Sequence, residues 1–266
     1  MIYLLQELHT AGVALLIFVC FAASLISFYS GFGLGTLLLP VFALWFPVNE
    51  AIIMTAIVHF INNLFKLMLI RKNIDPMILL RFGVPAIVGA LIGSLILNFL
   101  SRWPINFPAK ILHMQVMMSP VKLLIGLLII VFGAMEFIDF GKRAWSLKSM
   151  TIGGVLSGFF GGLSGHQGAL RSAFLLRYQL TKEIFIATGI GIACLVDTAR
   201  IIVYSPQIFN GSMQSKVVYI MLGIVAAFAG AWFGNRYLKK LDLKWIKFIT
   251  ALGVIAIGIF IAIGLI

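Results

Sequence analysis

Long apolar runs alternate with short polar or basic joints along the whole chain. A membrane-spanning helix needs about 20 mainly apolar residues, and we place such runs at residues 11–46, 50–70, 77–100, 120–139, 150–178, 183–204, 216–238 and 245–265. Apolar residues are continuous within these runs rather than alternating with polar ones, which argues against the strands of a membrane barrel. The pattern predicts an all-α protein that crosses a membrane several times.

The first and fifth runs are too long for one crossing. A straight helix of about 36 residues would reach about 54 Å, whereas the hydrocarbon core is about 30 Å thick. Each run holds a glycine cluster near its centre, S-G-F-G-L-G at residues 30–35 and G-G-L-S-G-H-Q-G at residues 161–168. Glycine supplies the backbone angles of a chain reversal. We therefore predict that each run breaks at its cluster and forms a helical hairpin that dips into the membrane.

Composition supports a bilayer environment, and charge predicts an orientation within it. Hydrophobic residues make up 62% of the 266 residues, charged residues 11%, and the mean hydropathy is +1.11, which is too apolar for a soluble fold of this length. The net charge is +12, but the basic residues gather in joints near residues 71–72, 142–148, 177–182 and 236–247. This placement argues against a nucleic-acid partner and predicts a multi-pass membrane protein with these joints in the cytoplasm and both termini outside.

The two halves of the chain repeat one another. The cluster that ends at Gly35 aligns with S-G-H-Q-G ending at Gly168, and the same offset pairs residues 49–57 with residues 182–190. We therefore divide the chain into an N-terminal repeat, residues 1–140, and a C-terminal repeat, residues 141–266. Each contains a helical hairpin and three crossings, an odd number, so the second repeat is expected to be inverted relative to the first. Inverted repeats with broken helices are typical of transporters.

Several motifs together resemble one family. They are the L-L-L-P after the first glycine cluster, N-E-A-I-I-M-T-A-I-V-H-F-I-N-N from residue 49, the basic joint R-K-N-I-D, and G-G-V-L-S-G-F-F-G-G-L-S-G-H-Q-G-A-L-R-S-A-F-L-L from residue 153. Over nearly the whole chain this resembles the sulfite exporter TauE/SafE family of membrane transporters. The resemblance implies movement of sulfite, organosulfonates or related small anions across the bacterial cytoplasmic membrane, and no enzymatic activity. The chain departs from the family's usual glycine triplets, having Leu34 in the first and His166-Gln167 in the second, and has Ala173 in place of a proline.

The second glycine cluster carries the candidate anion-binding residues. A half-helix that starts at about Ala169 would direct its N-terminal amides at an anion. Ser164, His166 and Gln167 would add side-chain donors, and Arg171 a planar charged fork that suits sulfonate or carboxylate oxygens. In the first repeat, the backbone at Gly33 and Gly35 would contribute to the same site. The alternatives are that the three polar side chains only satisfy freed backbone groups, and that Arg171 extends to the cytoplasmic surface.

Other polar residues lie inside the predicted spans, where they are costly and tend to be paired or functional. Asp197 and Arg200 are three residues apart and share a helical face. Arg200 is a second candidate for attracting the anion, and Asp197 is our candidate for proton coupling, although a purely structural ion pair remains open.

The second apolar run adds a group of polar side chains from the first repeat. Asn63 is a binding candidate there, with interhelical hydrogen bonding as the alternative for it and Asn62. His59 lies one turn before Asn63 on the same face. For Lys66 we favour an extended side chain that reaches the inner interface.

Functions of other classes fit less well. Residues 162–165, G-L-S-G, match the serine motif of rhomboid-like intramembrane proteases, but His166 is too near in sequence to act as its base and no histidine follows. A phosphate-binding loop for ATP is absent from the sequence, and Cys20 and Cys194 lie in apolar runs that suggest neither a disulfide nor a metal site.

We therefore expect a secondary carrier of a small anion that works without a cofactor by alternating access, most simply of sulfite, an organosulfonate or a related sulfur oxyanion, with protons as the candidate coupling ion. An anion channel and a carboxylate carrier remain open. So does a membrane scaffold built around the semi-amphipathic residues 101–116. The sequence leaves the direction of transport and the oligomeric state undetermined.

Overall fold

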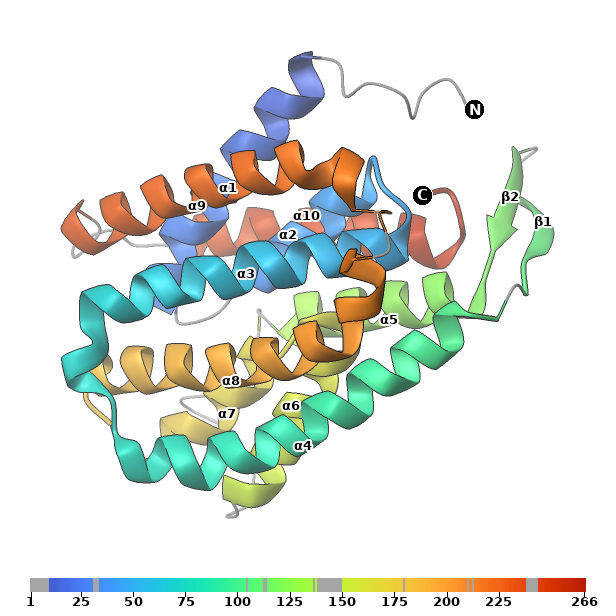
Figure 1. The fold of residues 1–266 in the computed structure, drawn as a ribbon. Coiled ribbons are helices and arrows are strands. Elements are labelled where there is room, and N and C mark those ends of the chain that lie inside the picture. The colour runs from blue at the N-terminus through green and yellow to red at the C-terminus, as the bar shows by residue number, and fades with distance from the viewer. Residues whose placement is uncertain are drawn as a thin grey trace.

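The computed structural model describes residues 10–30, 34–103, 105–111, 114–135, 137, 150–178, 180–209, 211, 213–237 and 244–266. These residues form ten α-helices and one two-stranded sheet (Figure 1). The helices are α1 (Thr10–Ser30), α2 (Leu34–Ala43), α3 (Val48–Ile70), α4 (Pro76–Ser101), α5 (Pro120–Met135), α6 (Met150–Ser164), α7 (Gly168–Leu175), α8 (Lys182–Phe209), α9 (Val217–Tyr237) and α10 (Lys244–Ala262).

Four of these helical stretches are long and apolar enough to cross a membrane: Val48–Asn73, Pro76–Ser101, Lys182–Phe209 and Gln214–Arg236. Large apolar side chains cover their outer faces; on α4, for example, Leu80, Val88 and Leu95 are more than half exposed. An apolar surface of this extent is stable in lipid and would aggregate in water. The helical membrane protein predicted from the apolar runs is confirmed.

A β-hairpin joins α4 to α5. Strand β1 (Phe107–Ile111) pairs antiparallel with β2 (Met114–Met118), with Phe107 opposite Met118, and the hairpin projects from one end of the helical bundle (Figure 1). From the sequence we expected only a semi-amphipathic segment at residues 101–116 and no strands. Pro108 obscured the pattern, but proline is compatible with a strand that lies at a sheet edge, and both strands of a two-stranded sheet are edges.

Each of the two long runs is divided into two helices as predicted, and the start of α2 touches the second break. α1 ends at Ser30 and α2 begins at Leu34, while α6 ends at Ser164 and α7 begins at Gly168. Gly165 has a φ of 82°, a left-handed conformation that favours glycine. A Cβ atom on Gly35 would lie only 2.8 Å from the carbonyl oxygen of Gly165. The start of α2 therefore packs backbone against backbone on the second break; Gly33 lies outside the described residues.

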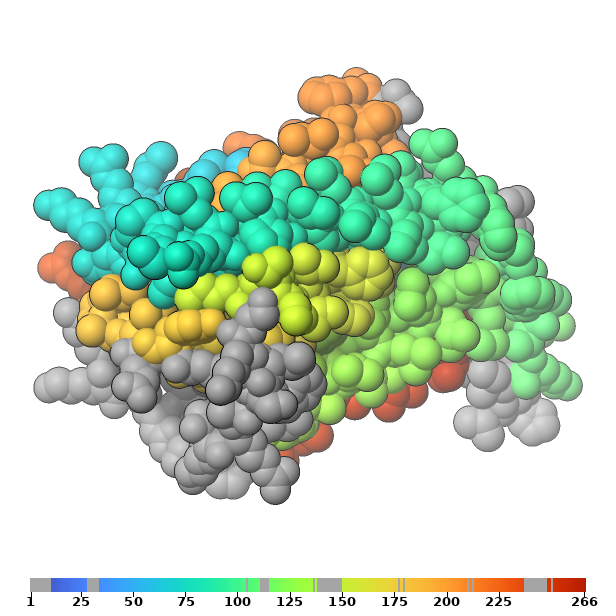
Figure 2. All heavy atoms as spheres, turned by 90° about the horizontal axis from the view of Figure 1, so that it is seen from below, coloured from blue at the N-terminus to red at the C-terminus, as the bar shows by residue number. Residues whose placement is uncertain are grey.

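Glycines also bring α4 and α6 into close contact. A Cβ on Gly154, Gly158 or Gly162 of α6 would overlap a backbone carbonyl of α4. Seen from below, the atoms of α4 and α6 lie against one another (Figure 2). Such small-residue seams let membrane helices approach closely, and this seam holds the α6–α7 break against the rest of the bundle.

The same seam geometry recurs between α1 and α9. A Cβ on Gly89 of α4 would overlap the Val155 oxygen and lie 2.8 Å from the Phe159 nitrogen of α6. A Cβ on Gly230 of α9 would overlap the Phe21 oxygen and lie 3.1 Å from the Leu25 nitrogen of α1. Phe21 and Leu25 precede the last residue of α1 by the same intervals as Val155 and Phe159 precede the last residue of α6.

Candidate functional site

A small buried cavity lies where the two helix breaks meet. Its volume is about 20 Å³, compared with the roughly 10–15 Å³ needed to hold one water molecule. The first turns of α2 and α7 both contribute to its wall, so unpaired amides at two helix starts are close to it. The cavity is lined by Ser27, Leu34, Gly35, Thr36, His59, Asn63, Lys66, Gly165, Gln167, Gly168, Arg171, Ile190 and Ala193.

Four of the residues expected from the sequence line this cavity: Gly35, Asn63, Gln167 and Arg171. Arg171 is 4% exposed, so its side chain is buried at the break instead of extending to the surface. Gln167 is also buried, and neither atom of its amide group has a hydrogen-bond partner among the described residues. A buried amide without a partner is costly. A polar solute in the cavity would remove that cost.

Backbone contacts hold Gln167 in place. Its carbonyl oxygen accepts hydrogen bonds from Ser157 Oγ at 3.0 Å and from the backbone N–H of Arg171 at 3.0 Å. The first bond connects the break to α6, and the second is the hydrogen bond that closes the first turn of α7. The backbone of Gln167 is therefore held by the helices on both sides of the break.

Lys66 is a cavity residue that we interpreted differently from the sequence. We expected it to reach the inner interface, but its side chain is 1% exposed. Its Nζ donates a hydrogen bond of 2.6 Å to Ser27 Oγ of α1. With the Asn62 amide in the orientation that satisfies its neighbours, Asn62 accepts from the same Nζ at 3.3 Å. The serines Ser24 and Ser27, three residues apart in an otherwise apolar run, are the sequence signal for this polar pairing.

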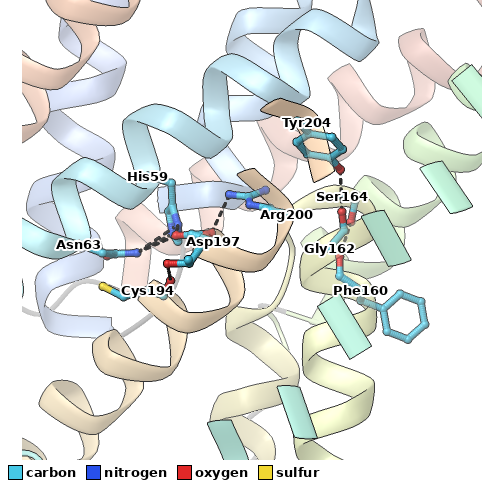
Figure 3. A network of polar contacts seen from close by, with 10 residues as sticks. His59, Asn63, Phe160, Gly162, Ser164, Cys194, Asp197, Arg200 and Tyr204 are labelled. Carbon is cyan, nitrogen blue, oxygen red and sulfur yellow. Dashed lines mark hydrogen bonds and ion pairs between the residues drawn. The ribbon is translucent and has the colours of Figure 1, made fainter. Parts of the chain in front are cut away.

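A second polar group lies beside the cavity, between α3 and α8 (Figure 3). Asp197 is completely buried, with one carboxylate oxygen 2.6 Å from His59 Nδ1 and the other 2.9 Å from Arg200 NH2. Asn63 Nδ2 donates to the first of these oxygens at 3.4 Å. The ion pair follows from the three-residue spacing in α8. The contact with His59 joins positions 138 residues apart, and no pattern in the sequence indicates it.

The remaining candidates from the sequence surround the second break without lining the cavity. Ser164 Oγ donates to the Phe160 oxygen at 3.1 Å, and His166 Nδ1 lies 3.1 Å from Ser164 Oγ. The His166 ring stacks on Phe132 of α5, with ring centroids 5.6 Å apart. Arg200 packs against the backbone of the break, since its NH1 would lie 2.8 Å from a Cβ on Gly165.

Tyr204 adds a further hydrogen bond to the second break. Its hydroxyl donates to the Gly162 oxygen at 2.8 Å (Figure 3), near the end of α6, where carbonyl groups have no partner within the helix. Within the described ranges, no group of three or more His, Cys, Asp and Glu side chains is placed to hold a metal ion.

Apolar membrane-spanning helices, two touching helix breaks and a buried polar cavity between them define a multi-pass membrane transporter. The family described as sulfite exporter TauE/SafE matches residues 16–261. The chain belongs to this family of membrane transporters, which are not enzymes, so the protease alternative is excluded. Searches of curated proteins and of solved structures gave no match.

Proposed function

We propose that the protein is a secondary carrier that moves a small sulfur oxyanion, such as sulfite or an organosulfonate, across the inner membrane by alternating access. The observation that carries this proposal is the buried cavity at which two helix starts, Gln167 and Arg171 meet. Helix N-termini and a guanidinium group are both favourable partners for anionic oxygens.

The alternating units would be the two repeats, residues 1–140 and 141–266, with inverted topologies. Gly89 of α4 packs against α6 in the same way as Gly230 of α9 packs against α1, and this match supports an equivalence between the repeats. The equivalent helices α3 and α8 run in opposite directions (Figure 1). In keeping with this, the N–H of Asp75, just beyond α3, bonds Thr188 near the start of α8 at 2.9 Å. Antiparallel equivalents are what an inverted repeat requires.

The proposed orientation keeps the basic joints in the cytoplasm and both termini outside. The end of α3, the starts of α4, α8 and α10, and the end of α9 lie at the same end of the bundle, on the left of Figure 1. The exposed basic residues Arg71, Lys72, Lys182 and Arg236 lie at these helix ends. A bias of this kind toward one end supports the orientation.

In the proposed binding mode, the anion's oxygens accept hydrogen bonds from the first turns of α2 and α7, from Gln167 and from Arg171. Asn63 lines the same cavity and contributes a further amide. Ser164, His166 and Arg200 act from behind the cavity, where they hold the break in position. An anion channel is the alternative to a carrier. A short carboxylate offers similar oxygens and is the alternative solute.

Protons are the proposed coupling ion. Asp197 shares a short contact with His59, whose ring lines the cavity, so a proton held by this pair would lie next to the bound anion. A positive charge added there would strengthen anion binding, which couples the two equilibria.

Transport into liposomes tests the proposal. Purified protein would be reconstituted, and uptake of sulfite, an organosulfonate and acetate measured over a range of concentrations. A carrier predicts saturable uptake that responds to a pH gradient, and selection of sulfur oxyanions over acetate. Uptake that rises linearly with concentration would indicate a channel, and no uptake of any of the three would refute the proposal.

A further inference from the structure

The helices of the two halves of the chain are interleaved in space. The helices that α4 of the N-terminal half contacts most extensively are α6 and α8 of the C-terminal half. In the same way, α9 of the C-terminal half mainly contacts α1 and α3 of the N-terminal half. Each half has therefore exchanged one helix with the other. The result is a first bundle of α1, α2, α3 and α9 and a second bundle of α4, α6, α7 and α8, which lies below the first in Figure 1.

Each bundle is held together by contacts between the two halves of the chain. In the second bundle, a glycine seam joins α4 to α6, and the rings of Phe82 in α4 and Phe174 in α7 meet edge to face with centroids 6.5 Å apart. In the first bundle, the matching seam joins α9 to α1, and Phe228 of α9 stacks on Phe65 of α3 with centroids 4.4 Å apart. Close-packed interfaces resist continuous deformation, so each bundle should behave as one rigid body.

The second bundle has a hydrophobic core of its own. The buried side chains of this core come from α4, α7 and α8, and residues of α6 pack around them. The first bundle packs around a separate cluster, in which the described buried residues from the second bundle are Leu97, Leu163 and Tyr204. A separate core is what allows a group of helices to keep its structure while it moves.

The two bundles meet along α3 and α8 and at the second helix break, and the buried cavity lies in this contact. Its wall is made by α1, α2 and α3 of the first bundle and by α7, α8 and the second break of the second bundle. The bond of 2.6 Å between His59 and Asp197 joins the bundles beside the cavity. Movement of one bundle against the other would therefore change access to the cavity and load on this bond.

The chain passes directly between the bundles at two joints, from α3 to α4 and from α8 to α9. A 3-10 turn lies in each joint, Arg71–Asn73 in the first and Gln214–Lys216 in the second. The joints are at opposite ends of the molecule (Figure 1). Hinges are typically a few residues at the ends of elements, and short 3-10 turns are common connectors. The remaining helices, α5 and α10, pack mainly on each other and are assigned to neither bundle.

We propose that alternating access is a rocking of the first bundle against the second, so that the moving bodies are the two halves with α4 and α9 exchanged. This inference rests on the proposed transport function and refines its division into residues 1–140 and 141–266. It predicts that α1 stays with α9 during transport and that α4 stays with α8. Helices α1 and α4, which belong to the same half, should move relative to one another. Movement of the two halves as continuous stretches of chain would give the opposite result.

One substitution tests whether α1 and α9 move together. Sγ of the native Cys20 in α1 lies 3.4 Å from a Cβ at Gly223 of α9, which is close enough for a disulfide. Oxidation of the Gly223→Cys protein in liposomes should link the two helices, and intact mass would measure the linked fraction. Linking should leave the initial rate of sulfite uptake nearly unchanged. The matched control is Gly223→Cys combined with Cys20→Ala, which undergoes the same oxidation without a link.

Distances between spin labels test both bundles without a cross-link. The labelled variants are Leu15→Cys in α1, Phe99→Cys in α4, Phe209→Cys in α8 and Val218→Cys in α9, all at exposed positions. The native cysteines are buried and should stay unlabelled. Electron paramagnetic resonance in liposomes, with and without sulfite and on both sides of neutral pH, should show constant distances for the pairs α1–α9 and α4–α8. The distance between the labels on α1 and α4 should change.

Two kinds of result would overturn the inference while leaving anion transport intact. One is loss of uptake when Cys20 is linked to α9, with recovery on reduction. The other is a constant distance between the labels on α1 and α4 in a protein that transports sulfite, or a change within the α1–α9 or α4–α8 pair. No uptake of any anion by liposomes that contain the native protein would instead refute the proposed function itself.

Discussion

The helices that follow the two breaks, α2 and α7, carry different side chains. α2, which follows the first break, has the sequence L-G-T-L-L-L-P-V-F-A and contains no charged residue. α7, which follows the second, carries Arg171 in its first turn and Gln167 immediately before it. At the offset that aligns Gly35 with Gly168, Leu38 occupies the position that matches Arg171. A helix start after a glycine cluster therefore does not by itself bring a charged side chain with it.

The first half supplies its charge by another route. Lys66 reaches the cavity from the crossing helix α3 and is held by Ser27 of α1. The position in α8 that matches Lys66 is Ala199. In the proposed function the two helix starts offer a common means of binding an anion, while each half contributes its cation from a different element.

The largest expected effect tests the equivalence of the two glycine seams, α4 on α6 and α9 on α1. Gly89→Leu and Gly230→Leu should each lower the free energy of unfolding by about 3 kcal/mol or more, because each new side chain would collide with the backbone of the facing helix. Thermal melting of the detergent-purified proteins measures this. Gly253→Ala is the control, since no atom lies within 4 Å of a Cβ there. If one of the two leucine variants melted like the native protein, the seams would not be equivalent.

A pair of substitutions at matching positions tests the difference between the breaks. Arg171→Met should lower the initial rate of sulfite uptake by about 10-fold to 100-fold, because a charge-assisted contact to the anion is lost. Leu38→Met, a change that conserves volume, should leave uptake nearly unchanged. Similar uptake by the two variants in liposomes would show that the charge on α7 has no part in transport.

Asp197, His59, Asn63 and Arg200 form a polar cluster between α3 and α8. Substitutions in this cluster separate a structural role of Asp197 from a role in proton coupling. Asp197→Asn should lower stability by about 3 kcal/mol, since Arg200 is left as an unpaired buried charge, and uptake should stop responding to an imposed pH gradient. His59→Gln should also abolish the pH response but leave the ion pair intact. An undiminished response in both variants would restrict Asp197 to a structural role.

The smallest effect is expected at the support behind the second break. Tyr204→Phe removes the hydrogen bond to the Gly162 oxygen and should cost about 1 kcal/mol of stability. The rate of uptake should be the same as in the native protein, because Tyr204 does not line the cavity. A large loss of uptake without loss of stability would place Tyr204 in the transport path.

Much of this arrangement could be predicted from the sequence because it depends on local features. Apolar run lengths and glycine clusters located both breaks, and the three-residue spacing of Asp197 and Arg200 anticipated their ion pair. Arg171 and Gln167 were found because polar residues inside an apolar run are conspicuous. These signals arise within one helix or at its end, where spacing determines which side chains are neighbours.

Contacts between distant helices could not be predicted in the same way. The position of Lys66 along its apolar run predicts a side chain that reaches the inner membrane interface. Ser27, which accepts its hydrogen bond, lies 39 residues away in the sequence, so the pairing could not be predicted. The bond between His59 and Asp197 depends on how α3 packs against α8. Ser164 and His166 were grouped with Gln167 by sequence, but the turn at Gly165 directs His166 toward Phe132. Only the tertiary packing decides such directions.

The central claim is that an anion binds between the two breaks through Arg171. The most direct test is a thermal-shift measurement on purified protein with sulfite, sulfate, thiosulfate, short organosulfonates and short carboxylates, with Arg171→Gln measured in parallel. A ligand that binds only the folded state raises the melting temperature. We expect a rise with sulfur oxyanions for the native protein that is lost in Arg171→Gln. An equal rise in the variant would contradict the claim, because the anion would then bind elsewhere.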